Sequence, residues 1–176
     1  MIFAPTAVGG AFVLEPERFE DERGFFARTW DGEELSARGL DGGLVQSSIS
    51  WSGRRGTLRG LHYQAPPGEE TKIVRCTAGS IHDVVLDLRA GSPTYRCHDA
   101  ALLSAENRRA MYVPKGCAHG FVTLEDGVEV LYLMSTPHAP DLARGVRWDD
   151  PAFGIRWPEE VRVISERDRS YPAYEG

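Results

Sequence analysis

Short runs of β-forming residues recur along the chain, and turn-forming residues separate them at fairly even intervals. This pattern restricts the fold more than any other feature, because many short strands with regular turns are typical of an all-β sandwich or small barrel. The turns include Pro66-Pro67-Gly68 and Asp126-Gly127, and the second of these predicts a β-hairpin. The predicted strands cover residues 11–14, 24–29, 44–50, 57–63, 72–78, 81–88, 110–113, 120–124 and 128–134.

Helical structure is predicted in one place, residues 31–38. Asp31 can cap the N-terminus, the first turn is acidic, and Gly39 follows the last turn. From Pro137 onward the chain is rich in Pro and Asp and poor in β runs, which predicts loops and short helical turns wrapped around the barrel. Because no repeat or linker divides the 176 residues, they are predicted to form a single domain over 1–176.

Charge and cysteine content limit the partners and the compartment. The formal net charge of −6 argues against nucleic acid and anionic membranes as partners, since both require a broad basic surface, but not against a small anion. The odd number of cysteines, three, without a Cys-x-x-Cys pair, indicates reduced thiols. With no basic segment ahead of an apolar one at the N-terminus, we expect a cytoplasmic protein without a nucleic-acid or membrane partner.

Cationic side chains are concentrated between Arg55 and Gln64, in an otherwise apolar β run, with Lys72 shortly after. Any one of them has an ordinary explanation, a solvated strand end or a hydrogen-bonded core histidine. Together they favour a site for an anion beside His62, because a buried charge without a partner is costly. Arg59 and His62 are an odd number of residues apart, so a regular strand would point them to opposite faces. Either a bulge at Gly60 brings both to one cavity, or Arg59 reaches the mouth and His62 the interior.

A second motif, Pro114-x-Gly116-x-x-His119, has a spacing that recurs in cupin jelly-roll barrels. Metal-binding cupins also carry a His-x-His pair and a Glu, but here the corresponding place reads His62-Tyr63-Gln64. A metal site would therefore depend on His62, His119 and Glu70, and the missing ligand favours a barrel without metal.

The alternation of side chains along a strand predicts that Tyr132 points into the barrel. Val128, Val130, Tyr132 and Met134 share one face of their run, while Glu129 lies on the other. An isolated inward tyrosine is more often a core residue with a satisfied hydroxyl than a functional group.

Motifs that follow one another along nearly the whole chain occupy residues 21–26, 46–50, 56–64, 70–76, 83–89, 91–95, 103–107, 113–121, 130–132, 144–151 and 165–168. In this order they resemble the dTDP-4-dehydrorhamnose 3,5-epimerase family of nucleotide-sugar epimerases.

The resemblance implies a cupin-type β jelly-roll barrel with a few short peripheral helices. It also implies an isomerase that epimerises a dTDP-linked 4-keto-6-deoxy sugar at C3 and/or C5 in deoxysugar biosynthesis, with no metal and no organic cofactor. A homodimer that exchanges N-terminal strands is implied as well.

Carried over by position, the resemblance implies a catalytic set. His62 is the general base and Asp168 the carboxylate that orients it. Tyr132 is the acid on the opposite face of the sugar. Lys72 stabilises the enolate oxygen at C4, and His119 lines the sugar site. The chemistry suits these residue types, because a 4-keto group acidifies the hydrogens on C3 and C5, and a fixed cation stabilises the enolate that forms.

Further positions are implied to bind the substrate. Arg23, Gln46 and Arg59 contact the nucleotide sugar, with Arg59 directed at the pyrophosphate. Phe26 helps to wall the pocket, and Arg167 also belongs to the substrate-binding set.

Four positions depart from the family pattern near the nucleotide. Arg28 stands where Glu is usual, Ser48 where Asn is usual, and His138 where a Tyr usually stacks on thymine; all three are predicted substrate contacts. Ala143 replaces a common acidic residue. These changes leave the catalytic set intact. They leave open whether the sugar is a rhamnose precursor or a secondary-metabolite deoxysugar, and whether C3, C5 or both are inverted.

Three other functions are compatible with the sequence. A 3,4-ketoisomerase would share the barrel and the substrate class but would not need Tyr132 opposite His62. A metal-dependent cupin would use His62 and His119. A non-catalytic sugar-nucleotide binding module would have no use for an acid and a base on opposite faces of the sugar, so the presence of both argues against it.

Overall fold

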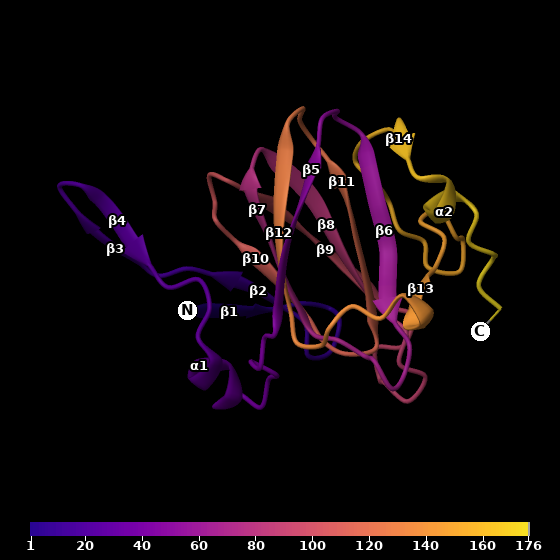
Figure 1. Ribbon diagram of the computed structural model, residues 1–176, viewed down its shortest axis with the longest axis horizontal. Helices are drawn as coiled ribbons and strands as arrows, with labels where there is room; N and C mark the ends of the chain where they lie inside the picture. Colours follow the sequence, from indigo (N-terminus) through magenta and orange to yellow (C-terminus); the bar gives the residue numbers. More distant parts are fainter. Residues whose placement is uncertain (176) are drawn as a thin grey trace.

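Two antiparallel sheets face one another around a shared apolar core, which confirms the predicted all-β jelly-roll barrel (Figure 1). The structure is a computed structural model and describes residues 1–175. Within these residues no helix combines the length and apolar character needed to cross a membrane.

The first sheet has the strand order β1-β2-β10-β7-β12-β5, so that β5 is an edge strand. Its central strand β7 pairs with β10 on one side and with β12 on the other. The strand bounds are β1 Ile2–Pro5, β2 Phe12–Glu15, β5 Gln46–Ser52, β7 Lys72–Ala78, β10 Ala110–Val113 and β12 Val128–Met134.

The second sheet has the order β13-β6-β11-β8-β9, and the short strand β14 adds to β6 in parallel. The C-terminal segment therefore contributes two strands to the edge of this sheet, beside the predicted loops and helical turns. The strand bounds are β6 Thr57–Gln64, β8 Ser80–Asp87, β9 His98–Ser104, β11 Cys117–Thr123, β13 Ala143–Gly145 and β14 Val163–Ile164.

The core lies between the sheets, where alternate residues of facing strands meet. Val74 and Val130 from the first sheet and Val85 and Phe121 from the second are almost fully buried there, and Tyr132 packs against the same cluster. Burial of a side chain of this size stabilises the folded state by roughly 1.5–3 kcal/mol. The period-2 pattern of β12 is thus confirmed, and it turns Tyr132 inward.

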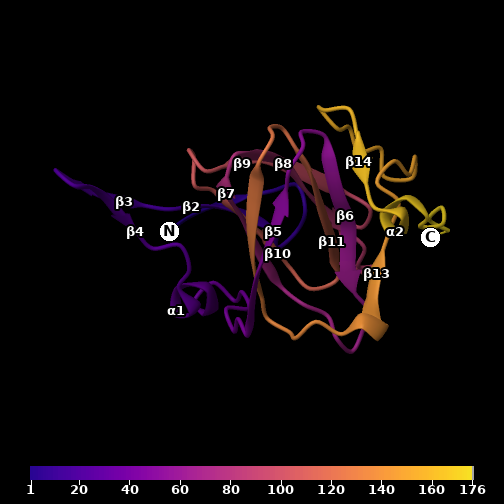
Figure 2. The ribbon, with the colours of Figure 1, turned by 45° about the horizontal axis from the view of Figure 1, so that its top comes forward.

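Two peripheral parts complete the fold. The hairpin of β3 (Arg18–Asp21) and β4 (Gly24–Ala27) projects away from both sheets in two views (Figures 1 and 2). Three short helices are α1 (Gly32–Ser36), η1 (Pro140–Leu142) and α2 (Glu166–Arg169). Asp31 caps α1 as predicted, by accepting hydrogen bonds from the backbone N–H groups of Glu33 and Glu34, although the helix ends two residues before the predicted limit.

The predicted hairpin at Asp126-Gly127 is wrong. β11 before this turn pairs with β6 and β8 in the second sheet, whereas β12 after it pairs with β5 and β7 in the first. The local sequence specifies a turn, but the neighbours of each strand decide which sheet it joins. The strand pattern also missed β9, whose sequence HDAALLS contains no β-branched residue and which is paired along its length with β8.

A bulge in β6 brings Arg59 and His62 to the same cavity, as the first alternative predicts. His62 pairs with His119 and Arg59 with Phe121, so β6 has one more residue than β11 in this interval. Gly60 has a φ of +126°, and a Cβ there would lie 2.5 Å from the Cα of Gly120. The bulge therefore requires glycine at this position.

Candidate functional site

Two adjoining cavities lie between strands β5 and β12 of the first sheet and strand β6 of the second. The larger has a volume of about 560 Å³ and the smaller about 350 Å³. Their linings share His62, Lys72, Tyr132 and Arg167, so they form one continuous site. The larger cavity also contains Arg59 and is bounded by β14 and α2.

His62 and Asp168 form the most clearly defined pair in the site. The Nε2 atom of His62 lies 2.7 Å from Oδ1 of Asp168, and the Asp168 side chain is only 6% exposed. Burial favours the protonated acid, but hydrogen bonds from His62 and from the Gly60 N–H outweigh it and lower the pKa of Asp168. An ionised Asp168 only accepts hydrogen bonds, so Nε2 of His62 carries the proton in this contact.

Tyr132 approaches the same space from the facing sheet. Its hydroxyl lies 3.2 Å from Oγ of Ser50, and its ring meets that of His119 edge to face with centroids 6.3 Å apart. Burial raises the pKa of Tyr132 to about 12, because the phenolate is poorly solvated there. The side chain is therefore a protonated donor throughout the neutral range.

Lys72 supplies a fixed positive charge between these groups. Its Nζ atom donates to Oε1 of Glu70 at 2.9 Å and to the backbone carbonyl of His62 at 3.3 Å. The Lys72 and Glu70 side chains are 11% and 8% exposed, so the ammonium is held with little freedom. Such a fixed cation stabilises a negative charge that develops nearby.

A second histidine–carboxylate pair lies deeper in the barrel. His119 and Asp83 are 2.7 Å apart and almost completely buried. Among the described residues, Oδ2 of Asp83 is the only fully buried side-chain oxygen or nitrogen without a hydrogen-bond partner. Burial raises the pKa of Asp83 despite the opposing effect of His119. Of this pair, only His119 lines the larger cavity.

The predicted metal-ligand alternative is not assembled. Glu70 is paired with Lys72, while His62 and His119 each bind a different aspartate. Across residues 1–175, no three His, Cys, Asp or Glu side chains converge on a position where they could hold a metal ion.

Polar residues predicted to bind the nucleotide sugar line both cavities. Arg59 is held by Oγ of Ser52 and the carbonyl of Trp51, at 3.1 and 2.9 Å, and borders the larger cavity. In the smaller one, the side-chain oxygen of Gln46 accepts a hydrogen bond from the backbone of His138 at 2.6 Å. Ser48 and Ala143 also line this cavity.

Arg23, Phe26 and Arg28 are not brought to the cavity of their own chain. Arg23 pairs with Asp21 at the end of the projecting hairpin, and Phe26 on the same hairpin is 69% exposed. Arg28 pairs with Asp31 ahead of α1, at 2.9 Å.

The strand and motif patterns missed other residues of the site. Ser50 has a usable signal, because Gln46, Ser48 and Ser50 alternate along one face of β5. Ser165 caps α2 by accepting a hydrogen bond from the N–H of Asp168. Tyr171 contacts His62, but it follows α2 in a segment without periodicity, so no sequence signal points to it.

Comparisons with known proteins all match this chain to epimerases of one kind. The family model described as dTDP-4-dehydrorhamnose 3,5-epimerase matches residues 5–175. The enzyme of that name from Sinorhizobium fredii is 41% identical over 174 residues, covering 98% of this chain and 89% of its own.

Solved structures of two relatives have the same fold. The crystal structure of dTDP-4-dehydrorhamnose 3,5-epimerase from Elizabethkingia anophelis is 35% identical with a TM-score of 0.96, covering 99% of this chain and 96% of its own. A 3′-monoepimerase from Streptomyces bikiniensis in complex with dTDP-quinovose is 34% identical with a TM-score of 0.87, covering 96% and 86%.

Proposed function

Because this chain belongs to the dTDP-4-dehydrorhamnose 3,5-epimerase family, a group of isomerases with the cupin-type jelly roll, we propose that its two cavities bind a dTDP-linked 4-keto-6-deoxy sugar and that His62 and Tyr132 invert C3, C5 or both. One observation carries the assignment. A carboxylate-oriented histidine on the second sheet and a protonated tyrosine on the first line the same cavities, with the Lys72 ammonium in the shared lining.

The proposed reaction uses these groups in turn. Nδ1 of His62 removes the proton from the carbon next to the ketone, and the C–H electron pair moves to the C4 oxygen as an enolate. Lys72 stabilises the negative oxygen; one such donor is worth roughly 3 kcal/mol of barrier in comparable sites. Tyr132 then delivers its proton to the other face of the same carbon. Exchange with water returns His62 and Tyr132 to their starting states.

Substrate binding is assigned to the cationic and polar residues that border the reacting groups. Arg59 and Arg167 are proposed to hold the diphosphate, since guanidinium groups donate paired hydrogen bonds to phosphate oxygens. Gln46, Ser48 and His138 are proposed to face the nucleoside in the smaller cavity, with the His138 ring stacking on the base.

A homodimer is part of the proposal, because each chain keeps Arg23 and Phe26 away from its own cavity. The hairpin that carries them exposes Phe19, Phe25 and Phe26, and the edge strand β5 exposes Ile49 and Trp51, each 65% exposed. Large exposed apolar groups on an edge strand indicate a protein partner. We infer that each copy covers this edge strand of the other and inserts its hairpin beside the partner's cavity.

A cytoplasmic location also belongs to the proposal. Cys76, Cys97 and Cys117 are all free thiols, as expected for a protein of a reducing compartment.

Inversion at C3 alone is the second candidate. The similarity to a 3′-monoepimerase favours it, since that enzyme shares the fold at an identity close to that of the 3,5-epimerase from Elizabethkingia anophelis. The two candidates differ in how many carbons of one sugar reach the acid and base, so product analysis distinguishes them.

Proton NMR of dTDP-4-keto-6-deoxyglucose incubated with the protein in D2O tests the function. We expect deuterium to enter C3, C5 or both after chelator treatment, with inverted coupling constants at each epimerised carbon. His62→Ala should abolish exchange with the fold intact, whereas Arg59→Ala should chiefly raise KM. Exchange by the His62→Ala variant would refute the base assignment, and no exchange by the wild-type protein would refute the substrate or the activity.

A further inference from the structure

Tyr171 sits directly on the backbone of β13. A Cβ atom built on Gly145 would lie 2.3 Å from both Cε2 and Cζ of the Tyr171 ring. No side chain tolerates contacts this short, so the ring fills the space that the glycine leaves open. The lack of a side chain at Gly145 thus allows the Tyr171 ring, which follows α2 in the chain, to pack at a defined position against β13.

In this position the Tyr171 ring contacts the proposed base, His62. Gly145 is opposite His62 in the antiparallel pairing of β13 with β6. The Tyr171 and His62 ring centroids are 6.3 Å apart with an interplanar angle of 68°, an edge-to-face contact. The imidazole is therefore restrained twice, by Asp168 at Nε2 and by the Tyr171 ring at its side.

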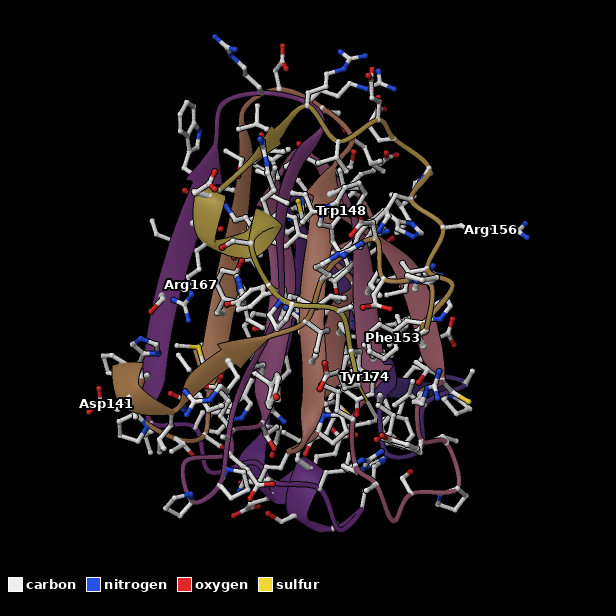
Figure 3. All side chains as sticks on the ribbon, turned by 90° about the vertical axis from the view of Figure 1, so that its right-hand side faces the viewer. Asp141, Trp148, Phe153, Arg156, Arg167 and Tyr174 are labelled. Atoms are coloured by element: carbon white, nitrogen blue, oxygen red, sulfur yellow. The ribbon has the colours of Figure 1, made fainter. Side chains whose placement is uncertain are left out.

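The hydroxyl of the same side chain holds a different group. Tyr171 accepts a hydrogen bond from Nε of Arg167 at 3.0 Å. Arg167 borders both cavities and extends below α2 in the view of Figure 3. Within residues 1–175 no carboxylate pairs with it, so its terminal amino groups stay available to an anion. A guanidinium fixed at Nε loses less rotational freedom when it binds phosphate.

We propose that Tyr171 is a positioning residue with two separable parts: its ring orients His62, and its hydroxyl directs Arg167 toward the diphosphate of the substrate. This assignment rests on the proposed function. A single residue of the C-terminal segment would then couple the position of the base to the position of the bound nucleotide.

Two substitutions at Tyr171 separate the parts. Tyr171→Phe keeps the ring and loses only the hydrogen bond, so we expect dTDP binding to weaken about fivefold while kcat stays within about twofold of the wild type. Tyr171→Ala loses the ring as well. Its dTDP affinity should fall by the same factor, but kcat should fall about 10- to 100-fold, since small misplacements of a catalytic group are costly.

Gly145→Ala gives an independent route to the ring. Because the added Cβ would also lie 2.7 Å from the Tyr171 hydroxyl oxygen, it displaces the ring and the hydroxyl together, and it should reproduce the falls in kcat and in dTDP affinity expected of Tyr171→Ala. Calorimetry with dTDP, steady-state kinetics and a thermal unfolding curve are measured for each variant. An unchanged unfolding midpoint excludes a loss of fold in each variant. Tyr171→Phe is the variant in which dTDP affinity should change while kcat does not, a combination that a loss of fold would not produce.

Tyr174→Phe is the matched control. Tyr174 belongs to the same segment, and its hydroxyl lies 2.7 Å from that of Tyr95, outside both cavities. We expect wild-type kinetics and dTDP affinity from it. Wild-type kcat in Tyr171→Ala, or unchanged dTDP affinity in Tyr171→Phe, overturns the assignment while the function stands. A wild-type protein that neither binds dTDP nor turns over the 4-keto sugar refutes the function, and this assignment with it.

Discussion

Two side chains of the site acquire opposite properties from their surroundings. Hydrogen bonds hold the pKa of Asp168 below that of an ordinary carboxyl, and burial holds the pKa of Tyr132 at about 12. At neutral pH the first is a permanent acceptor and the second a permanent donor. Because the folded-state pKa of Asp168 is the lower one, its contribution to stability is present above the ordinary carboxyl pKa and disappears as the pH falls through the lowered value.

Tyr132→Phe should uncouple exchange from inversion. The proposed base His62 remains, so deuterium should still enter the sugar from D2O. Without a donor on the other face, the configuration of the sugar should be retained. Epimerisation should fall at least about 100-fold, the usual contribution of a positioned general acid. NMR of the recovered sugar gives both quantities. Inversion at the wild-type rate would remove Tyr132 from the mechanism.

The dependence of wild-type kcat on pH in the alkaline range is a second test of Tyr132. With a Tyr132 pKa of about 12, loss of its proton should not reduce kcat below roughly pH 10.

At the scale of elements, α2 is a short helix whose main role is to deliver Asp168. Its first turn is capped by Ser165, whose Oγ accepts from the Asp168 N–H at 3.1 Å. Of the two strands that flank the cavity, β12 pairs with β5 along its whole length, whereas β6 pairs with β11 across the bulge at Gly60. The proposed base and acid therefore rest on strands of the two main sheets, and the carboxylate proposed to orient the base rests on a single capped turn.

Ser165→Ala should lower activity more than stability. Loss of a serine cap costs about 1 kcal/mol of local helix stability, which should move Asp168 and reduce kcat several-fold while the unfolding midpoint changes little. Ser104→Ala removes a comparable bond, to the N–H of Asn107 at 3.0 Å, far from the cavity, and serves as the control with unchanged kcat. Equal kcat in both variants would contradict the role given to the cap.

Strands were predictable from the sequence where a run of β-forming residues is bounded by turns, and less predictable elsewhere. The runs 72–78, 110–113 and 128–134 match β7, β10 and β12 to the residue, since their apolar faces reach the core. The placement of β11 and β12 in different sheets was not predictable from Asp126-Gly127, because a turn sequence fixes local backbone geometry and not the next pairing partner.

For the whole molecule, the hairpin of β3 and β4 decides whether one chain makes one complete site. It extends into solvent with Arg23 at its end, while the cavity that would use Arg23 opens elsewhere on the chain. A symmetric pair in which each hairpin serves the other copy would complete two sites at once.

Mixed dimers test this exchange. His62→Ala and Arg23→Ala should each be inactive or weak alone. Co-expressed, they should recover about a quarter of wild-type activity, because half of randomly paired dimers are mixed and each has one intact site. Light scattering should give the mass of two chains. Dimers without recovery would place Arg23 beside its own cavity or outside the site.

The sequence by itself determined the β-rich class of the fold and the inward face of Tyr132, because alternation acts through the local backbone. It offered the bulge at Gly60 as one of two alternatives, and the pairing of β6 with β11 decided between them. The family pattern determined which residue types to expect around the sugar. Tertiary structure alone decided which sheet each strand joins, that Tyr171 rests on Gly145 beside His62, and that the hairpin stands apart from its own cavity. These contacts join residues distant in the chain, and no periodicity within a short segment encodes them.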